Sequence, residues 1–588
     1  MTGFGHTSAL GLSCILAFTS PSLFTGCQVQ ATSATDLAPQ HDYRPIVTPP
    51  NKLSNVGFSD HVKRQVTSFH GREDATVKVK PLAMVLRATA LAMAFVPLLV
   101  LAPFAMMLSS FREICWFPLL AFTLGQLGAA FIKWAQWSST RPDLFPEALC
   151  RALAPLTHAA PRHSWGHTKK KVEAALEAPL TSAFEDFDPV PLASGSVAQV
   201  HRATLKGRAG HVAVKVTHPK VAERLAVDFA LMGLLARAVD LVTGGWLNLE
   251  ESTAQFASCM AGQADLGAEA AALDHFNWNF RRWRDAKFPR PLLRSPDVLV
   301  ESFEEGMLVS KYSLLWQQSE RQRKAGGRRR VLRGGAATAA MDPATAHFIV
   351  RRGEDMYLKM LLADNLMHAD LHPGNILVQS EGGVGLCVLD AGMVAKLTPE
   401  EQRNFVGFIS NLAKGDGARA GRCLLRFSAA QTCRGEVATG RFVRDVQLLF
   451  ARTCRGYGTG TQVGEVLRAT LALVRRHGVR VDANYATLIL NILCLDGLAQ
   501  GLVPEYNVVD GAHALLAFHD RVKRLPGGAR AARLLLPLGQ ALKARQDRRF
   551  FRRLLRAQRR EEEDLLRGAL EEEGGGGGGG GPLDDMLR

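Results

Sequence analysis

Two aspartates and an asparagine in the second half of the chain have the types and spacing of a phosphoryl-transfer site. Asp370 lies five positions before Asn375, and Asp390 follows a short apolar run and precedes Ala391 and Gly392. In kinase-type sites the first Asp faces the phosphoryl acceptor, while the Asn and the second Asp hold Mg²⁺ through amide and carboxylate oxygens. The letters HPGN within this stretch are by themselves ordinary turn chemistry. The assignment therefore depends on a matching cation elsewhere in the chain.

That cation is Lys215, which lies at the end of a β-like run far upstream. The runs VAQVHRATL and HVAVKV read as strands, and the turn-forming segment KGRAG separates them. A loop of small residues precedes both runs and consists of Ala193, Ser194, Gly195 and Ser196. A kinase N-lobe has this order, with the loop over the phosphates and the lysine at the α- and β-phosphates. The loop has a single glycine, so it is not the G-x-G-x-x-G motif.

A buried ammonium needs an acidic partner, so a helix near Lys215 is expected to supply a carboxylate. The segment GQADLGAEAAALDHF looks helical and carries Gln263, Asp265 and Glu269, of which Glu269 is the predicted partner. The later run PDVLVESFEEGMLVS is β-like and then turns. It stands where the backbone of a kinase hinge would bind adenine, which predicts an ATP site between two lobes.

The elements around these residues predict an α+β, protein-kinase-like fold with two lobes, an N-terminal helical extension and a mostly α-helical C-lobe. With 588 residues, the chain is too long for one core. The expected segments are a disordered or targeting segment (1–80), a candidate transmembrane helix (88–111), a helical extension (116–180), an N-lobe (181–310), a basic insertion (311–341), a helical C-lobe (342–560) and a charged, polyglycine tail (561–588). Within the insertion, the stretch 317–340 is expected to be a solvated loop. A capped helix is expected to begin at Thr398.

The uncharged run from Ala88 to Phe111 is the main candidate for contact with a membrane. At about 1.5 Å per residue, a helix of this length crosses a hydrocarbon core of about 30 Å. The alternative is a buried helix packed on the following domain. No comparable run follows, so the chain is expected to span at most once. The first 80 residues match neither a secretory signal nor an Arg-rich presequence, which leaves a targeting role and a plain extension both open.

The composition narrows the classes of partner. The net charge of +16 favours anionic partners such as nucleotides or an anionic membrane face. The basic residues lack interleaved aromatics and a recognition motif, so no nucleic-acid partner is predicted. Ten cysteines occur without C-x-x-C spacing, which favours single reduced thiols over a disulfide framework or a zinc site.

Over about residues 116–500 the sequence resembles the UbiB/ADCK family of atypical kinase-like proteins. The segment FIKWAQWSSTRPDLFP is similar to the family's K-x-G-Q region, with Lys133 and Gln136 in place and Ala135 where Gly is usual. The segments LASGSVAQVHRA, VAVK, HADLHPGNILVQ and LDAG resemble the family's alanine-rich loop and its catalytic motifs. This resemblance implies that the K-x-G-Q helices cover the side of the site that ordinary kinases leave open to a peptide.

The resemblance also implies ATP and Mg²⁺ as cofactors, ATP hydrolysis, membrane association and support of isoprenoid-quinone (ubiquinone) biosynthesis. The implied partners are a membrane lipid or a quinone precursor, together with quinone-biosynthesis enzymes, and the oligomeric state stays open. The implied location is the mitochondrial inner membrane or, alternatively, a chloroplast membrane. The implied roles are catalysis for Asp370 and Lys215, nucleotide binding for residues 193–196, Lys215 and Glu269, metal binding for Asn375 and Asp390, and regulation for Lys133 and Gln136.

The sequence departs from the family pattern at several positions and leaves two other functions open. The family's E-x-D motif appears as Gln263-x-Asp265, which loses one carboxylate, and Ala135 changes how closely the backbone can approach there. One alternative function is a phosphotransferase acting on a protein, lipid or small molecule, because HADLHPGN also resembles aminoglycoside and choline kinases. The other is a non-catalytic scaffold of a membrane enzyme complex.

Overall fold

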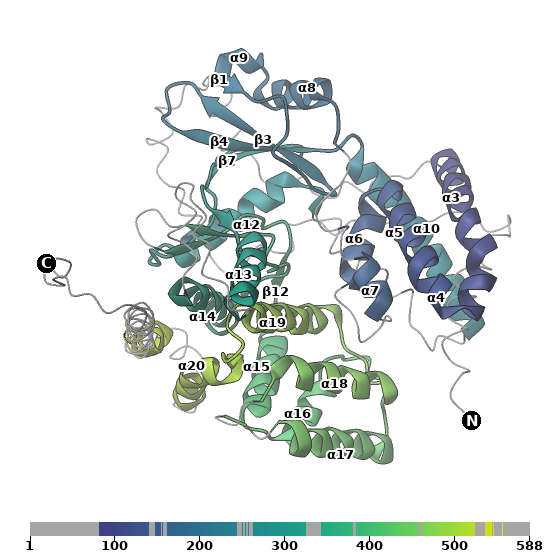
Figure 1. Ribbon diagram of the computed structural model, residues 1–588, viewed down its shortest axis with the longest axis vertical. Coiled ribbons are helices and arrows are strands. Elements are labelled where there is room, and N and C mark those ends of the chain that lie inside the picture. Colours follow the sequence, from purple (N-terminus) through teal and green to yellow (C-terminus); the bar gives the residue numbers. More distant parts are fainter. Residues whose placement is uncertain are drawn as a thin grey trace, which may run out of the picture.

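The computed structural model describes residues 81–139, 147–153, 162–243, 263–324, 343–379, 384–454, 461–523 and 535–543, with isolated residues between these ranges. A sheet-containing N-lobe, a helical C-lobe and a group of extension helices lie together, with the extension beside both lobes (Figure 1). The α+β, two-lobe prediction is confirmed. The predictions for residues 1–80 and 561–588 lie outside the described part of the chain.

The N-lobe contains a six-stranded sheet in the order β1-β3-β4-β7-β6, with β2 paired to β3. Its strands are β1 (Phe184–Phe187), β2 (Ala193–Ser194), β3 (Ala198–Leu205), β4 (His211–Thr217), β6 (Pro291–Arg294) and β7 (Val298–Ser302). Val212, Val214 and Val216 are fully buried against α8 (Trp165–Leu176) and α9 (Leu180–Ala183). Because side chains alternate along a strand, Lys215 lies on the opposite face of β4.

The predicted turn at KGRAG joins β3 and β4. Gly207 and Gly210 have φ values of 71° and 86°. Glycine adopts this left-handed region without the steric cost that a Cβ brings. The antiparallel register that follows places Val200 opposite Lys215.

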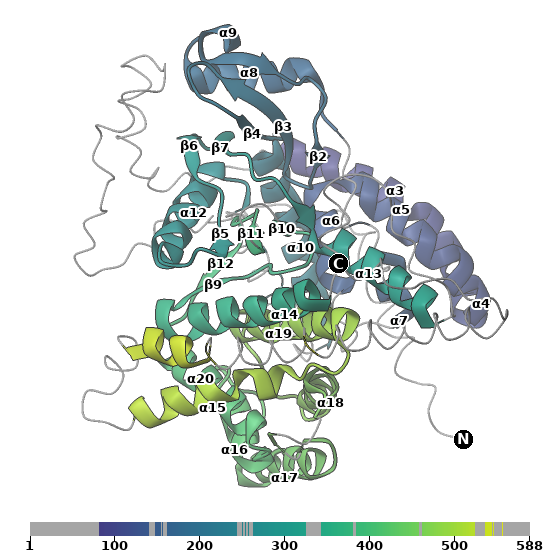
Figure 2. The same ribbon diagram turned by 60° about the vertical axis from the view of Figure 1, so that its left-hand side comes forward.

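Helix α12 (Leu266–Phe280) packs on β6 and β7 and lies between the lobes (Figure 2). Asp265 is its N-cap, and the carboxylate accepts hydrogen bonds from the backbone N–H groups of Gly267 (2.8 Å) and Ala268 (3.3 Å). Such a cap satisfies donors that the first helical turn leaves free. The cap therefore fixes where Glu269 stands, one turn into the helix.

The extension consists of helices that fold back on one another. They are α3 (Pro81–Met107), α4 (Ser109–Phe111), η4 (Arg112–Trp116), α5 (Phe117–Leu127), α6 (Ala129–Ser139) and α7 (Glu147–Leu153), and α10 (Val221–Thr243) packs beside them. Trp116 Nε1 donates to the carbonyl of Leu98 (3.0 Å), and the Arg87 guanidinium donates to the carbonyl of Leu127. These two contacts make α3 and α5 an antiparallel hairpin, and Figure 2 shows the two helices side by side.

The predicted helix at 88–111 differs from the structure at both ends. The helix α3 begins seven residues earlier, at Pro81, and the backbone leaves helical geometry at Leu108, where φ is −117° and ψ is 105°. Among the described residues, Met84–Met107 and Asn484–Leu502 are long and apolar enough to cross a membrane. Of their most apolar windows, 22% and 50% are buried, respectively. Transmembrane insertion of α3 stays a prediction.

The C-lobe combines two small sheets with a bundle of helices (Figure 2). The sheets have the orders β5-β11-β10-β8 and β12-β9. Their strands are β5 (Ala286–Lys287), β8 (Met307–Leu308), β9 (Leu366–His368), β10 (Ile376–Gln379), β11 (Gly385–Val388) and β12 (Val394–Lys396). The helices are α13 (Val309–Lys324), α14 (Pro343–Lys359), η7 (Met360–Asp364), α15 (Pro399–Ala413), α16 (Gly417–Leu424), α17 (Glu436–Thr453), α18 (Val463–Arg476), α19 (Ala483–Leu502) and α20 (Val508–Lys523). The expected capped start at Thr398 is confirmed as a capping box with Glu401.

The prediction of a loop over 317–340 is wrong at its beginning. Helix α13 continues to Lys324, so residues 317–324 are helical. The physical reason is the apolar spacing that precedes the basic residues, since Val309, Tyr312 and Trp316 are buried in the core. They anchor the helix, and its charged end continues the same turns. The stretch 325–340 lies outside the described residues.

Candidate functional site

The loop between β9 and β10 holds Asp370 and Asn375 next to each other. The His368 ring is buried; its Nε2 donates to the Asp390 carbonyl, and its Nδ1 accepts from the Asp370 backbone N–H (3.1 Å). The amide nitrogen of Asn375 donates to the carbonyl of Asp370 (3.2 Å) and to its carboxylate (3.4 Å). Asn375 also accepts a backbone hydrogen bond from Leu389 (2.8 Å). The segment carrying Asp390 is thus tied directly to this loop.

Lys215 crosses from β4 to meet Glu269 of α12, as predicted. The Lys215 Nζ lies 2.6 Å from Glu269 Oε1 and 3.0 Å from the carbonyl oxygen of Leu389. The same Glu269 oxygen accepts from the backbone N–H of Ala391 (3.4 Å). Asp390 in turn accepts from the backbone N–H of Gly392 (2.7 Å). This chain of contacts connects the N-lobe lysine to the C-lobe aspartate.

The charges of this cluster perturb one another. Burial opposes ionisation of Lys215, but Glu269, Glu301 and Asp390 outweigh it and raise the pKa of the ammonium. Burial raises the pKa of Glu269, and Lys215 opposes that rise. Burial acts in the same direction on Asp390, but Lys215 and then Lys133 prevail and lower the pKa of that carboxyl. Asp390 is therefore ionised at neutral pH and suited to a cation.

The extension contributes Lys133 of α6 to the C-lobe loop. Its Nζ lies 3.9 Å from Asp370 Oδ2, and the two side chains are 18% and 30% exposed. Gln136 does not join them; its amide donates to the carbonyl of Leu156 (3.1 Å) within the extension. Ala135 is fully buried within helix α6. It does not stand at a turn, so the expected change in how closely the backbone can approach at a turn does not occur.

A shared hydrophobic cluster explains how the extension is held at the site. It includes Leu124 and Phe131 from the extension, Val197 beside the small-residue loop, and Phe229 of α10, with Met393 packed against it. Val197 and Met393 flank the two segments expected to touch a nucleotide. The extension is therefore packed onto the site, not only connected to it through the chain.

The small-residue loop is shorter in the structure than expected. Ala193 and Ser194 form the strand β2, paired with Val200 and Gln199, so only the residues from Gly195 onward turn. The Gly195 N–H donates to the carbonyl of Ala198 (2.9 Å), and Ser196 is buried. Residue Asp265, proposed from the E-x-D pattern, caps α12 and makes no described contact with Lys215.

The donor set fits Mg²⁺ held together with phosphate oxygens. The described residues contain no group of three or more His, Cys, Asp or Glu side chains that could hold a metal by themselves. Asn375 turns its amide nitrogen to Asp370, which leaves the amide oxygen for a cation beside the ionised Asp390. A Cβ on Gly392 would lie 3.2 Å from Asp390 Oδ1 and 3.9 Å from Glu269 Oε2, so glycine keeps this corner open. Mg²⁺ accepts one or two such protein oxygens plus water and phosphate.

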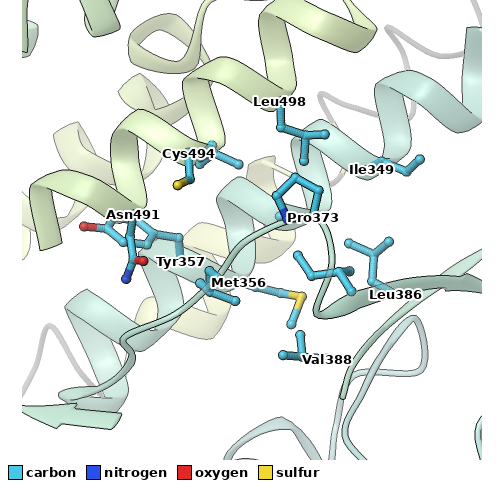
Figure 3. Close-up of a pocket in the computed structure, with 13 residues that line it drawn as sticks. Ile349, Met356, Tyr357, Pro373, Leu386, Val388, Asn491, Cys494 and Leu498 are labelled. Carbon is cyan, nitrogen blue, oxygen red and sulfur yellow. The ribbon is translucent and has the colours of Figure 1, made fainter. Parts of the chain in front are cut away.

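The cavity shown in Figure 3 is separate from this polar cluster. It has a volume of about 30 Å³ and lies beside the loop between β9 and β10, between Pro373 and Cys494 of α19. Such a volume holds about two waters. Asn491, also on its wall, donates to the His368 carbonyl (2.7 Å). The cavity is too small for a nucleotide.

Sequence reasoning predicted neither the contact of Glu301 with Lys215 nor the contact of Asn491 with the strand that precedes the Asp370 loop. Glu301 of β7 lies 3.2 Å from Lys215, and its side chain is 3% exposed. Strand periodicity could have placed Glu301 on the face of Leu299, but the register with β4 is needed to bring it to Lys215. Asn491 gives no sequence signal, because it is one of several polar residues in a mostly apolar helix and nothing in the sequence distinguishes it from the others.

Comparisons with known proteins agree with this geometry. A family model described as the ABC1 atypical kinase-like domain matches residues 155–423. A probable serine/threonine-protein kinase of Dictyostelium discoideum, abkC, is 29% identical over 468 residues, which cover 68% of this chain and 64% of that protein. The match thus spans less than two thirds of that relative's length. An ABC1 family protein of Saccharomyces cerevisiae, named as mitochondrial, is 27% identical over 514 residues, covering 74% and 75%.

The similarity extends to bacteria. A probable protein kinase UbiB of Erwinia tasmaniensis is 28% identical over 404 residues, which cover 66% of this chain and 68% of that protein. The residues that match the family model include Lys215, Glu269 of α12, Asp370 and Asp390. Residues 155–423 match the ABC1 atypical kinase-like domain, and the chain is similar to ABC1 and UbiB proteins of yeast and bacteria.

Proposed function

We propose that this protein is a kinase-like ATPase that binds Mg²⁺ and ATP and supports ubiquinone biosynthesis or lipid homeostasis at a mitochondrial membrane. The observation that carries the proposal is the convergence of Lys215, Asp370 and Asp390 from three separate segments. An Mg²⁺ ion would neutralise charge on the β- and γ-phosphates. Asp390 and Asn375 would hold that ion, and Lys215 would stabilise phosphate charge.

Water is the phosphoryl acceptor that best fits the contact at Asp370. The Lys133 ammonium lies 3.9 Å from this carboxylate, on a helix packed over the site. A protein acceptor would need to displace that helix, whereas a water molecule would not. Asp370 would orient the water and accept its proton. Transfer to a protein, lipid or small molecule remains the second activity to test, by following labelled phosphate into each class of acceptor.

The membrane setting rests on the extension and on the family. Helix α3 exposes Leu82, Met93, Val100 and Phe104, which are 70%, 68%, 65% and 56% accessible. Contiguous exposed apolar side chains of this size mark interaction surfaces. The yeast relative is named as mitochondrial, which favours that organelle over a plastid. A quinone precursor or membrane lipid would be reached from this surface.

Nucleotide binding is tested by thermal shift with and without Mg²⁺ and ATP. Wild type is expected to be stabilised by Mg²⁺ and ATP together, and Asp390→Asn is expected to lose the Mg²⁺-dependent part. Asp274→Asn is the matched control, because Asp274 pairs with Arg294 on the surface, away from the site. Equal responses of wild type and Asp390→Asn would remove the site assignment.

The pathway is tested by quinone profiling after loss of the gene, with rescue by wild type and by Asp370→Asn. A fall in ubiquinone that only wild type restores supports a catalytic role. Rescue by both forms would favour a non-catalytic scaffold. Normal quinone levels after gene loss would remove the pathway from the proposal and leave the ATPase to be judged by the binding test.

A further inference from the structure

The Lys215 ammonium is surrounded by three protein acceptors. Glu269 Oε1 lies at 2.6 Å, the carbonyl oxygen of Leu389 at 3.0 Å and Glu301 Oε1 at 3.2 Å. A lysine ammonium has three N–H donors. Three acceptors at these distances match its full donor capacity. A nucleotide phosphate can therefore reach Lys215 only by replacing one of them.

The Glu301 contact is the weakest of the three. It is the longest, and the other oxygen of the same carboxylate is buried and has no hydrogen-bond partner among the residues that the structure describes. Glu269, by contrast, has a shorter contact with Lys215 and accepts a second hydrogen bond from Ala391. The Leu389 carbonyl belongs to the backbone that carries Asp390 and cannot move by itself. Glu301 is thus the partner that a phosphate would displace.

The position of Glu301 places it at the nucleotide site. Glu301 is opposite Ala213 in the sheet, and its neighbour Leu299 is opposite Lys215, so the two charged side chains share one face. Strand β7 leads directly into the segment that joins the lobes. We propose that Glu301 is a positioning residue that withholds the Lys215 ammonium from nucleotide phosphates and has to release it before they bind. This inference rests on the proposed function and adds regulation of nucleotide binding by Glu301 at the same site.

The charge balance of the cluster supports this role. Lys215 faces the carboxylates of Glu269, Glu301 and Asp390, although one carboxylate is enough to pair one ammonium. A second buried carboxylate costs free energy of desolvation. Among the described contacts of Glu301, the one to Lys215 is the only ion pair. The carboxylate of Glu301 therefore binds the Lys215 ammonium and does not link other parts of the fold.

The withholding depends on pH. Burial raises the pKa of Glu301 to about 8, with Lys215 opposing the rise. The groups that face Glu301 are Lys215 of β4, Glu269 of α12, Asp390 after β11 and Cys387 of β11, whose thiol pKa is raised by burial. Below its pKa Glu301 is neutral and holds Lys215 weakly. Above that pKa it is ionised and competes with phosphate for the ammonium.

The test measures ADP binding in the presence of Mg²⁺ by titration calorimetry at about pH 6.5 and about pH 8.5. Glu301→Gln keeps the shape of the side chain and removes its charge. At the higher pH we expect Glu301→Gln to bind ADP about tenfold more tightly than wild type, the size of one contact to a charged group. At the lower pH the two proteins should agree within about twofold. Adenosine, which has no phosphate, should bind both proteins equally at either pH.

Two controls separate this role from a structural one. Glu305→Gln makes the same chemical change at an exposed position of the same segment and should bind ADP as wild type does. Glu301→Met removes every polar contact and should also bind ADP more tightly at high pH, with a melting temperature measured alongside. Equal or weaker ADP binding by Glu301→Gln at about pH 8.5 would overturn the inference. Absence of ADP and ATP binding in every form at both pH values would overturn the proposed function itself.

Discussion

Removing Arg87 is expected to release helix α3 from the protein. Arg87 Nε lies 2.6 Å from Asp228 Oδ1, and Arg87 Nη2 lies 2.9 Å from Asp228 Oδ2. These contacts form a bidentate ion pair between α3 and α10. The Asp228 side chain is 2% exposed and that of Arg87 is 25% exposed. Arg87→Met leaves a buried carboxylate without its main partner, which costs about 3–5 kcal/mol. Partial exposure of Arg87 places the expected loss near 3 kcal/mol.

Hydrogen–deuterium exchange of the α3 backbone amides measures this loss directly. If opening of α3 is destabilised by about 3 kcal/mol, its amides exchange about a hundredfold faster, because 1.4 kcal/mol is a factor of ten. Asp228→Asn should cost less, about 1–2 kcal/mol, since it leaves no buried charge. Arg112→Met is the matched control at the far end of the hairpin, where the guanidinium makes one 3.4 Å contact with the carbonyl of Ala105.

The effect of Arg87→Met also has a defined pH dependence. Burial raises the pKa of Asp228 even with Arg87 in place. Without Arg87 that pKa rises further, so the folded protein gains stability as the pH falls toward it and Asp228 becomes protonated. Protection lost at about pH 7.5 should therefore return in part at about pH 5.5, after correction for intrinsic exchange rates. Exchange rates of the α3 amides in Arg87→Met that stay within about threefold of wild type would refute the reasoning. Arg87 would then not be what holds α3 on the protein.

Three further changes test other parts of the framework. Phe276→Ala empties a fully buried position stacked on Phe288 (4.8 Å between ring centroids) and should lower the free energy of unfolding by about 3–5 kcal/mol in urea denaturation. Thr398→Ala removes the capping box of α15 and should cost about 1 kcal/mol in the same assay, whereas Thr398→Ser should cost less. Asn491→Leu leaves the His368 carbonyl without its donor, so it should lower ATPase turnover and cost about 1–3 kcal/mol of stability. Unchanged turnover in a folded Asn491→Leu protein would show that the contact of α19 with His368 is not needed for activity.

The parts of the site that could be predicted are those where local spacing decides geometry. Asp370 and Asn375 share one loop, and Asp390 follows the next hairpin strand, so their proximity depends on a few residues of chain. The Lys215–Glu269 pair joins distant segments, yet the need of a buried ammonium for an acid was enough to predict it. In both cases the residue types were sufficient for the prediction, and the register of the strands was not needed.

The parts that could not be predicted depend on packing between distant elements. Whether Glu301 meets Lys215 depends on the register of β7 against β4, and a shift of one residue would turn it to the other face. The helical start of the basic insertion was hidden because charge dominates its composition, while three buried residues upstream decide its structure. The break at Leu108 is a backbone feature that apolar composition does not reveal.

The contact between Lys133 and Asp370 has a consequence for fragments of this protein. The family model begins at residue 155, but the lysine that faces the acceptor-side aspartate lies before that boundary. Asp390 also depends on Lys133 for part of its lowered pKa. A recombinant fragment starting at residue 155 would keep the lobes and lose this cation from both aspartates. Under the proposed function, the turnover and metal affinity of such a fragment would differ from those of the full chain, because Lys133 would no longer face Asp370.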